Sequence, residues 1–387
     1  MRYIPRALSG PLLKAAPHFP VLILTGPRRS GKTTLFRRTF PKASYHLLED
    51  PDVIGRVRSD PRSFLDEVRL PAILDEIQNV PELLGYIRTR VDASDSRQGR
   101  WFLTGSQEPA LMKGVTESMA GRAAVFQLLP LSFAETPKVT LLKGGFPEVL
   151  SRPSVSDLWF RSYIQTYLER DVRSISSIRD LSTFRRFLAL TASRIGRILN
   201  RSDLAAPLGV SVPTITSWLN ILEATHQILL VPPYFENFGK RLVKSPKLYF
   251  ADSGLAAHLL GIESDRMLAK SAFFGPLFEG YVASEIAKAQ INAGGRKEIY
   301  YFRDSQGLEV DFVIPRSGRR LLLLEAKASR TVRPDDAGPL GRLKKAISGY
   351  AVDAILLHLS AKSSPPLASI LPGIRSATLG DIPRLVP

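Results

Sequence analysis

A loop with glycines at fixed spacing, directly after an apolar run at residues 21–24, constrains this chain more than any other feature. Every fixed position of the phosphate-loop pattern is present, in the order Gly26, Pro27, Arg28, Arg29, Ser30, Gly31, Lys32, Thr33, with Thr34 following. Its glycines let backbone N–H groups surround phosphate oxygens, and the start of a helix adds positive potential there. The sequence therefore predicts an ATP site, with Lys32 on the β- and γ-phosphates and the Thr33 hydroxyl in the shell of Mg²⁺.

A second apolar stretch, residues 72–74, ends in the carboxylates Asp75 and Glu76. In a parallel sheet the carboxyl ends of the strands face the ligand crevice. We expect Asp75 to hold Mg²⁺ through water and Glu76 to polarise the attacking water as the catalytic base. The alternative is an ordinary strand that ends in solvated acidic residues.

Two further features resemble parts of an ATPase site. Residues 101–106 form an apolar run that ends in small polar side chains, and either Thr104 or Ser106 could sense the γ-phosphate. Arg122 could stabilise transition-state charge in the site of a neighbouring subunit, because phosphoryl transfer depends mainly on positioning and electrostatics. The alternatives are a plain turn for the first feature and a surface arginine for the second.

Composition indicates a folded cytoplasmic protein that binds nucleic acid. The 387 residues predict two or three domains, and 53 Lys and Arg against 36 Asp and Glu give a formal charge of +17. Such an excess attracts polyanions through counterion release, so DNA is the leading partner, although incidental binding is the alternative. We expect no membrane helix and no secretory signal. The absence of cysteine excludes disulfides, thiol catalysis and thiolate metal sites.

The order of apolar and helical patterns predicts an α/β chain. Short strands at residues 21–25, 45–48, 72–75, 101–104 and 124–129 alternate with helical patterns, which favours a mostly parallel sheet. Residues 157–195 have helical spacing, and residues 309–314 and 321–327 flank a turn, as in a β-hairpin. We expect a nucleotide-binding domain at 1–135, a helical lid or linker at 136–195, a winged-helix-like domain at 196–262 and a mixed α/β domain at 263–387.

Residues 202–224 have a helix-turn-helix layout. A capped short helix and a glycine turn precede a helix at 212–224, which carries the polar residues Thr214, Thr216, Ser217 and Asn220. A basic hairpin is expected to follow, with Lys240, Arg241, Lys244 and Lys247 near its tip. Because the second helix has no Lys or Arg, we expect contact with DNA phosphates rather than bases. The alternative is a protein-contact module.

Three charged residues on the expected hairpin, Asp311, Glu325 and Lys327, form a pattern suited to metal-assisted phosphodiester cleavage. Glu325 and Lys327 share one strand face, and strand pairing could bring Asp311 beside them. Glu279, on a helix expected at 277–289, could add a carboxylate. The pattern resembles the Asp…Glu-x-Lys core of restriction-endonuclease-like folds. The alternative is an inactive fold in which these residues form a buried salt bridge.

An ordered set of short motifs extends the resemblance over nearly the whole chain. They are residues 26–34, 74–78, 103–107, 144–148 and 167–172. Together they resemble prokaryotic AAA-type ATP-binding proteins of the AAA+ superfamily with a C-terminal domain of unknown function. The resemblance implies an AAA+ P-loop core, Thr104 or Ser106 as the sensor, Arg122 as an arginine finger, and a ring or dimer of identical chains.

Three hypotheses about function follow. In the first, ATP binding or hydrolysis drives movement of a DNA-binding, nuclease-like C-terminal half. In the second, ATP orders a surface for a protein partner and the nuclease-like fold is inactive. In the third, the chain is a Mg²⁺-dependent DNA nuclease regulated by its nucleotide domain.

Overall fold

The computed structural model describes residues 3–93, 99–105, 115, 117–168, 181–234, 245–359 and 368–386. The chain divides into two compact units. Unit 1 contains Met1–Pro130, Ala224–His226 and Ile291–Gly295, and unit 2 contains Leu131–Glu223, Gln227–Gln290 and Arg296–Pro387. None of the described helices has the length and apolar character needed to cross a membrane.

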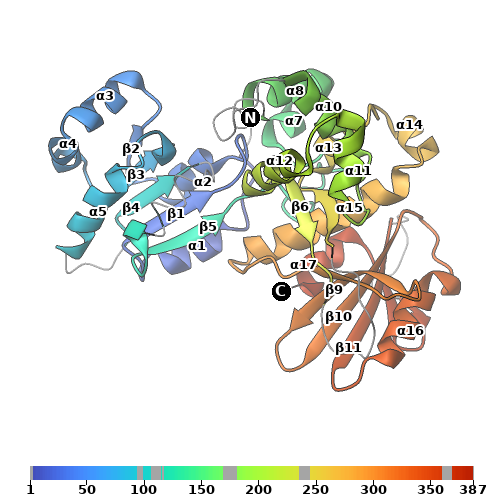
Figure 1. Cartoon of the computed structure of the whole chain (residues 1–387). Coiled ribbons are helices and arrows are strands. Elements are labelled where there is room, and N and C mark those ends of the chain that lie inside the picture. Colours follow the sequence, from blue (N-terminus) through green and yellow to red (C-terminus); the bar gives the residue numbers. More distant parts are fainter. Residues whose placement is uncertain are drawn as a thin grey trace. The chain divides into compact units, whose positions relative to one another are not determined.

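Unit 1 is built on a parallel sheet of five strands in the order β2-β3-β4-β1-β5 (Figure 1). The strands are β1 Val21–Thr25, β2 Ser44–Leu47, β3 Ala72–Asp75, β4 Trp101–Thr104 and β5 Ala123–Gln127. The helices are α1 Ser9–Ala15, α2 Lys32–Thr39, α3 Pro51–Ser59, α4 Pro61–Glu67 and α5 Leu83–Asp92. The α/β prediction for this part of the chain is confirmed.

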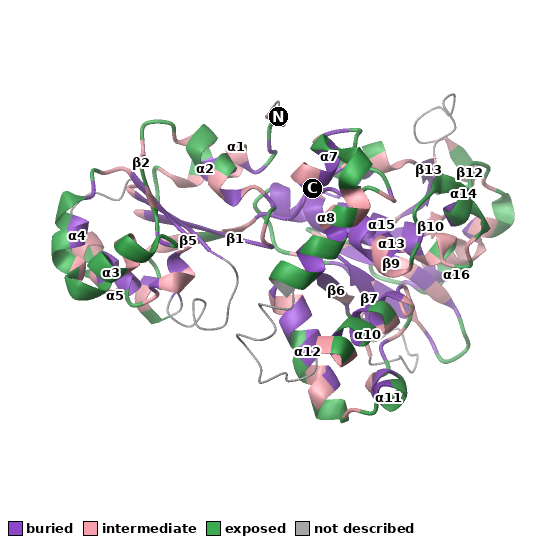
Figure 2. Cartoon of the chain, turned by 90° about the horizontal axis from the view of Figure 1, so that it is seen from above, coloured by how far each residue is buried: buried purple, intermediate pink, exposed green. Residues whose placement is uncertain are grey.

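Apolar residues on both faces explain why β1 lies inside the sheet. Val21 and Ile23 pack in one core cluster, with residues of α4 and α5, while Leu22 and Leu24 pack in another, with residues of α1 and α2. Successive side chains of a strand point to opposite faces, so this continuous apolar run needs helices on both sides. Figure 2 shows α1 and α2 on one side of the sheet and α3 and α5 on the other. The arrangement leaves the strand ends available for polar loops.

The first part of unit 2 is mainly helical. Its helices are α7 Pro147–Ser151, α8 Ser156–Tyr163, α10 Leu181–Ala192, α11 Arg201–Ala205, α12 Val212–Ala224, α13 Ser253–Leu259, α14 Asp265–Lys270 and α15 Phe274–Asn292. A π-helical segment, Ile164–Leu168, follows α8. The antiparallel strands β6 Ile228–Val231 and β7 Lys247–Phe250 come after α12. The expected helix at 212–224 is confirmed. The lid and winged-helix assignments stay predictions.

The second part of unit 2 is a mixed sheet of six strands in the order β12-β13-β11-β10-β9-β8. Its elements are β8 Tyr300–Arg303, β9 Glu309–Arg316, β10 Arg320–Lys327, α16 Gly338–Ala346, β11 Ala351–His358, β12 Ser369–Leu371, β13 Ile374–Ala377 and α17 Ile382–Leu385. Strands β9 and β10 pair antiparallel, with Phe312 opposite Leu324, which confirms the predicted hairpin. Its restriction-endonuclease-like character stays a prediction.

Replacing Leu323 by alanine should destabilise unit 2. Leu323, on β10, is fully buried among apolar residues of the sheet and α16, so its removal leaves a cavity. We expect the free energy of unfolding from urea denaturation to fall by about 2–5 kcal/mol. Leu158→Ala, on α8, is the control, because Leu158 is 59% exposed and its loss should change the same quantity by less than about 0.5 kcal/mol. Equal effects would contradict the assigned core.

Candidate nucleotide site and C-terminal acidic cluster

The phosphate loop connects the end of β1 to the start of α2 through backbone conformations that suit glycine. Gly26 and Gly31 have φ of 141° and 96°. A Cβ on Gly26 would lie 2.2 Å from the carbonyl oxygen of Leu128, so no larger residue fits. The Lys32 ammonium is buried and donates to the carbonyl oxygens of Gly26 and Pro27, both at 3.1 Å. The loop is therefore a tight turn of backbone whose carbonyl oxygens hold the Lys32 ammonium.

Asp75 lies at the centre of a set of hydroxyl groups. Its carboxylate accepts hydrogen bonds from Thr33 Oγ1, at 2.8 and 3.0 Å, from Tyr45 OH, at 2.8 Å, and from Thr104 Oγ1. The side chain is 3% exposed, so these donors replace water around the charge. Hydrogen bonds to this one carboxylate of β3 thus connect α2, β2 and β4.

Glu76 follows β3 in a left-handed conformation, with φ of 60°. Its backbone N–H donates to Thr104 Oγ1 at 3.1 Å, and its carboxylate accepts from Gln78 Nε2 at 2.5 Å. Thr104 therefore contacts both expected acidic residues. Ser106, the other candidate sensor, lies outside the described residues.

The sequence analysis missed two residues of this site. Tyr45 is on β2, next to β3, and burial together with its bond to Asp75 raises the pKa of its phenol, which keeps it a neutral donor. Arg6 donates to the carbonyl oxygens of Ser30, at 2.9 Å, and Leu129, at 2.7 Å, and so braces the loop. Tyr45 could have been found from the predicted neighbouring strands, but Arg6 has no local signal because its partners are remote in sequence.

Arg122 lies at the amino ends of the parallel strands, whereas the phosphate loop lies at their carboxyl ends. It precedes β5, whose first residue is paired with Val21 at the start of β1, whereas the loop follows the end of β1. Its guanidinium binds both carboxylate oxygens of Asp92, at 2.5 and 3.0 Å. A role in its own site is excluded by this placement, and a role in a neighbouring subunit stays a prediction.

Strand pairing brings Asp311, Glu325 and Lys327 together. Asp311 Oδ2 accepts from the backbone N–H of Ala326 at 2.9 Å, and Glu325 Oε1 accepts from Lys327 Nζ at 2.9 Å. Glu325 Oε2 is buried and has no hydrogen-bond partner among the residues that the structure describes. Burial, followed by the charge of Asp311, raises the pKa of the Glu325 carboxyl to about 8. A buried carboxylate oxygen without a donor is a position that a cation would satisfy.

Lys247 corrects the expectation of a basic hairpin tip. It is 2% exposed and its ammonium lies 2.8 Å from Glu279 Oε1, 2.5 Å from Glu309 Oε1 and 3.6 Å from Asp311 Oδ1. Lys247 and Tyr249 share one face of β7, and Tyr249 OH also donates to Glu279. The alternation of side chains in β7 turns Lys247 inward. Lys240, Arg241 and Lys244 lie outside the described residues.

This lysine limits the metal chemistry of the cluster. Burial and the charge of Asp311 raise the pKa of the Glu279 carboxyl to about 7, against the opposing effect of Lys247. Within the described ranges, no group of three or more His, Cys, Asp or Glu side chains is arranged to hold a metal ion. Asp311 and Glu325 remain as a pair, and Mg²⁺ is commonly held by one or two carboxylates with water. A cation held by Asp311 and Glu325, and the part expected of Glu279, therefore stay predictions.

The polar residues of α12 lie on the side away from its core contacts. Ser217 and Asn220 are exposed and Thr214 and Thr216 are half-buried, whereas Ile215, Trp218 and Leu219 are buried. The Thr216 hydroxyl donates to the carbonyl oxygen of Val212 at 3.0 Å, so it is partly satisfied within the helix. The helix carries no Lys or Arg, as the sequence indicated, and its one charged residue, Glu223, is half-buried.

Comparison with known families identifies the N-terminal part as an AAA-type P-loop ATP-binding domain. Residues 18–136 match the family described as "AAA domain". Residues 135–266 and 274–369 match two families described as domains of unknown function, DUF8612 and DUF4143. The AAA resemblance is thus confirmed, whereas winged-helix and nuclease-like assignments stay predictions.

Relatives cover most of the chain. The uncharacterized protein Rv2008c of Mycobacterium tuberculosis is 31% identical over 323 residues, which is 81% of this chain and 72% of the relative. The uncharacterized protein Mb2031c of Mycobacterium bovis gives the same values. The uncharacterized protein MJ1544 of Methanocaldococcus jannaschii is 21% identical over 385 residues, 88% of this chain and 81% of the relative. The chain belongs to the same family as the two mycobacterial proteins.

The solved structures with some similarity to this chain include an ATPase and a branch migration motor. The Walker-type ATPase PABY2304 of Pyrococcus abyssi has a TM-score of 0.44 and 17% identity, over 65% of this chain and 94% of that one. The RuvB Holliday junction branch migration motor of Thermotoga maritima has a TM-score of 0.32 and 15% identity, over 59% of this chain and 90% of that one.

Replacing Thr104 by valine should destabilise the nucleotide domain. The change keeps the shape but leaves the Asp75 carboxylate and the Glu76 N–H each without one partner, so we expect a loss of about 1–3 kcal/mol in the free energy of unfolding. Thr104→Ser should restore most of it. Thr191→Val is the matched control, because the buried Thr191 hydroxyl has no hydrogen-bond partner within the described ranges and its removal should not destabilise the chain. Equal losses at both positions, measured by urea denaturation, would contradict the role of Asp75.

Proposed function

We propose that this chain is a Mg²⁺-dependent ATPase whose nucleotide state controls a DNA-binding, nuclease-like C-terminal half. The main support is the convergence of three hydroxyl groups, from Thr33, Tyr45 and Thr104, on the buried Asp75 carboxylate beside the phosphate loop. Such an arrangement orients a carboxylate and a threonine hydroxyl toward one ligand position, as a metal-nucleotide site requires.

The loop and Lys32 would bind the triphosphate. Lys32 already lies among loop carbonyls, so its ammonium needs only a side-chain rotation to reach phosphate oxygens. Backbone N–H groups from Arg28 to Thr34 would surround the phosphates, and the start of α2 contributes positive potential. Thr33 and Asp75 would hold Mg²⁺, directly and through water. When bound, Mg²⁺ would neutralise charge on the β- and γ-phosphate oxygens.

Glu76 is proposed as the general base. It follows the metal-binding strand, and its bonds through Thr104 and Gln78 fix both its backbone and its carboxylate. The carboxylate would accept a proton from water as the water oxygen bonds to the γ-phosphorus and the bond to the ADP oxygen breaks. Thr104 would contact the γ-phosphate, Ser106 is the second candidate, and Arg122 of a neighbouring copy would supply a positive charge.

DNA is the proposed partner of the C-terminal half. The support is the formal charge of +17 and the exposed polar face of α12, which has the size and polarity of a groove-facing helix. Contact would go mainly to phosphates, because no Lys or Arg lies on α12. A cytoplasmic location and assembly of identical chains are part of the same proposal.

Metal-dependent DNA cleavage is a second candidate function, favoured by a buried Glu325 oxygen next to Asp311 and Lys327 that accepts no hydrogen bond from the described part of the chain. Asp311 and Glu325 would hold the metal, and Lys327 would stabilise negative charge on the phosphate. When bound, the metal would lower the pKa of its water and supply the nucleophile. If the site is inactive, the remaining hypothesis is that ATP orders a surface for a protein partner.

Glu76→Gln should abolish ATP turnover while ATP still binds. The amide keeps the shape of the side chain but cannot accept the proton, so we expect phosphate release to fall by at least about 100-fold. ATP affinity, measured by titration, should change by less than about threefold. Glu82→Gln is the control, because Glu82 is an exposed residue at the start of α5 and its change should leave both quantities unaltered. Full turnover in Glu76→Gln would remove Glu76 from the mechanism.

Asp311→Asn should abolish metal-dependent DNA cleavage, because it removes one of the two carboxylates for the cation. The measurement is nicking of supercoiled plasmid with Mg²⁺ or Mn²⁺. Asp335→Asn, an exposed change in the same unit, is the control and should cleave like the wild type. A wild type that cleaves nothing with either metal would rule out the nuclease candidate and favour the protein-interaction hypothesis.

A further inference from the structure

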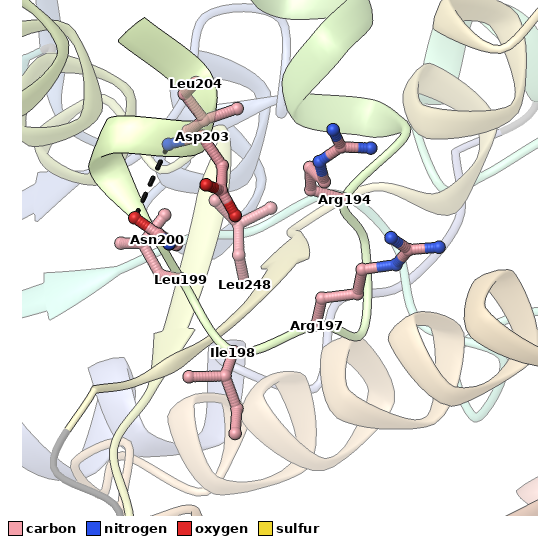
Figure 3. Close-up of a pocket in the computed structure, with 8 residues that line it drawn as sticks. All are labelled: Arg194, Arg197, Ile198, Leu199, Asn200, Asp203, Leu204 and Leu248. Carbon is pink, nitrogen blue, oxygen red and sulfur yellow. Dashed lines mark hydrogen bonds between the residues drawn. The ribbon is translucent and has the colours of Figure 1, made fainter. Parts of the chain in front are cut away.

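A pocket in unit 2 lies outside both sites described above. It has a volume of about 130 Å³ and is lined by apolar residues, among them Leu204 and Leu248, and by polar ones. Figure 3 shows Arg194 and Arg197 extending side by side on one side of it, opposite Asn200 and Asp203. The pocket therefore combines a cavity with two positive side chains, and neither sequence pattern nor family assigns it a ligand.

The backbone holds the two arginines at a fixed spacing. They flank a turn after α10, in which Gly196 has φ of 74°. Gly196 N–H donates to the carbonyl oxygen of Leu248 at 2.8 Å, and Leu248 N–H donates to the carbonyl oxygen of Arg197 at 3.1 Å. A Cβ on Gly196 would lie 3.3 Å from Glu279 Oε2. The turn is thus attached to β7, so the arginines are anchored by an ordered backbone.

The charge of this pocket is not neutralised internally. In the described part of the chain, neither guanidinium has a hydrogen-bond or ion-pair partner, in contrast to the paired Arg122 and Arg316. Asp203 is on the opposite rim and is not within ion-pair distance of either arginine. Its backbone N–H donates to Asn200 Oδ1 at 3.4 Å. Two unpaired guanidinium groups beside a cavity attract an anion, and their planar donors match phosphate oxygens.

The size of the pocket favours a single phosphate group. Sites for whole small molecules have volumes of roughly 300–1,000 Å³, which is larger than this cavity. A phosphate carried on a polymer needs no more room, because the rest of the chain stays outside. We propose that Arg194 and Arg197 bind one backbone phosphate of duplex DNA. This rests on the DNA partner proposed above and adds a contact that α12 does not include.

The pocket and the carboxylates around Lys247, which are those of Glu279, Glu309 and Asp311, occupy different faces of β7. Leu248 lines the pocket, whereas its neighbour Lys247 points to Glu279. This is expected because successive residues of a strand face opposite sides. Changes to the two arginines therefore lie on the face of β7 away from Asp311. DNA contact can be removed without altering the other proposed activities.

The test uses the full chain and a fluorescein-labelled duplex of mixed sequence, with anisotropy measured over a range of salt concentrations. Arg194→Gln/Arg197→Gln should weaken binding by about tenfold, and the slope of log affinity against log salt should fall by about 1. Asp203→Asn should tighten binding severalfold, because it removes a negative charge from the rim. Arg266→Gln/Lys270→Gln is the matched control, since both side chains are exposed on α14 and the same net charge is lost.

The outcomes separate this inference from the proposed ATPase. If the pocket pair and the control pair of substitutions weaken DNA binding equally, the pocket proposal is overturned. It is also overturned if the wild type binds DNA and the pocket pair does not weaken that binding. Neither result bears on the proposed ATPase activity. Loss of DNA binding in the pocket pair alone, with ATP turnover measured without DNA unchanged, supports it. Inorganic phosphate is titrated in parallel by calorimetry. Tight, arginine-dependent phosphate binding without any effect of the arginines on DNA would assign the pocket to a free anion and overturn the proposal.

Discussion

The buried charge of Asp75 is the constraint on which the nucleotide domain depends. A carboxylate at 3% exposure is costly unless donors surround it, and here hydroxyl groups from the loop helix and from strands on both sides supply them. Each of these donors is held by a different element: Thr33 by α2, Tyr45 by β2 and Thr104 by β4. The order β2-β3-β4 is what brings Tyr45, Asp75 and Thr104 together, so fold and site cannot be separated.

In the C-terminal half, partly buried carboxylates are also compensated, but by an internal ammonium group instead of by hydroxyl groups alone. Acidic residues from α15 and β9 converge, and an internal ammonium, that of Lys247, lies among three of their carboxylates. Breaking such a buried pair is strongly destabilising because a charge is left uncompensated. Asp311, one of these three carboxylates, also contributes to the raised pKa of the Glu325 carboxyl. Lys247 thus balances part of the negative charge of this cluster, while binding of a cation by Asp311 and Glu325 stays a prediction.

Local sequence was informative where a single segment determines the outcome. The glycine spacing predicted the loop, the apolar runs predicted the strands of unit 1, and the turn after Pro315 predicted the hairpin of β9 and β10. Only part of the set of hydroxyl groups around Asp75 could be predicted from the sequence, because Thr33 and Thr104 lie in recognisable motifs and Tyr45 does not. Lys247 was misplaced for a physical reason: its basic neighbours suggested an exposed hairpin, while its partners Glu279 and Glu309 are more than thirty residues away.

The most direct test of the account is an equilibrium titration of ATP with and without Mg²⁺, in the wild type and in Asp75→Asn. The account predicts saturable binding of one ATP per chain that Mg²⁺ strengthens in the wild type, and loss of the Mg²⁺ effect in the variant. Failure of ATP to bind the wild type with Mg²⁺ present, or an undiminished Mg²⁺ effect in the variant, would contradict it.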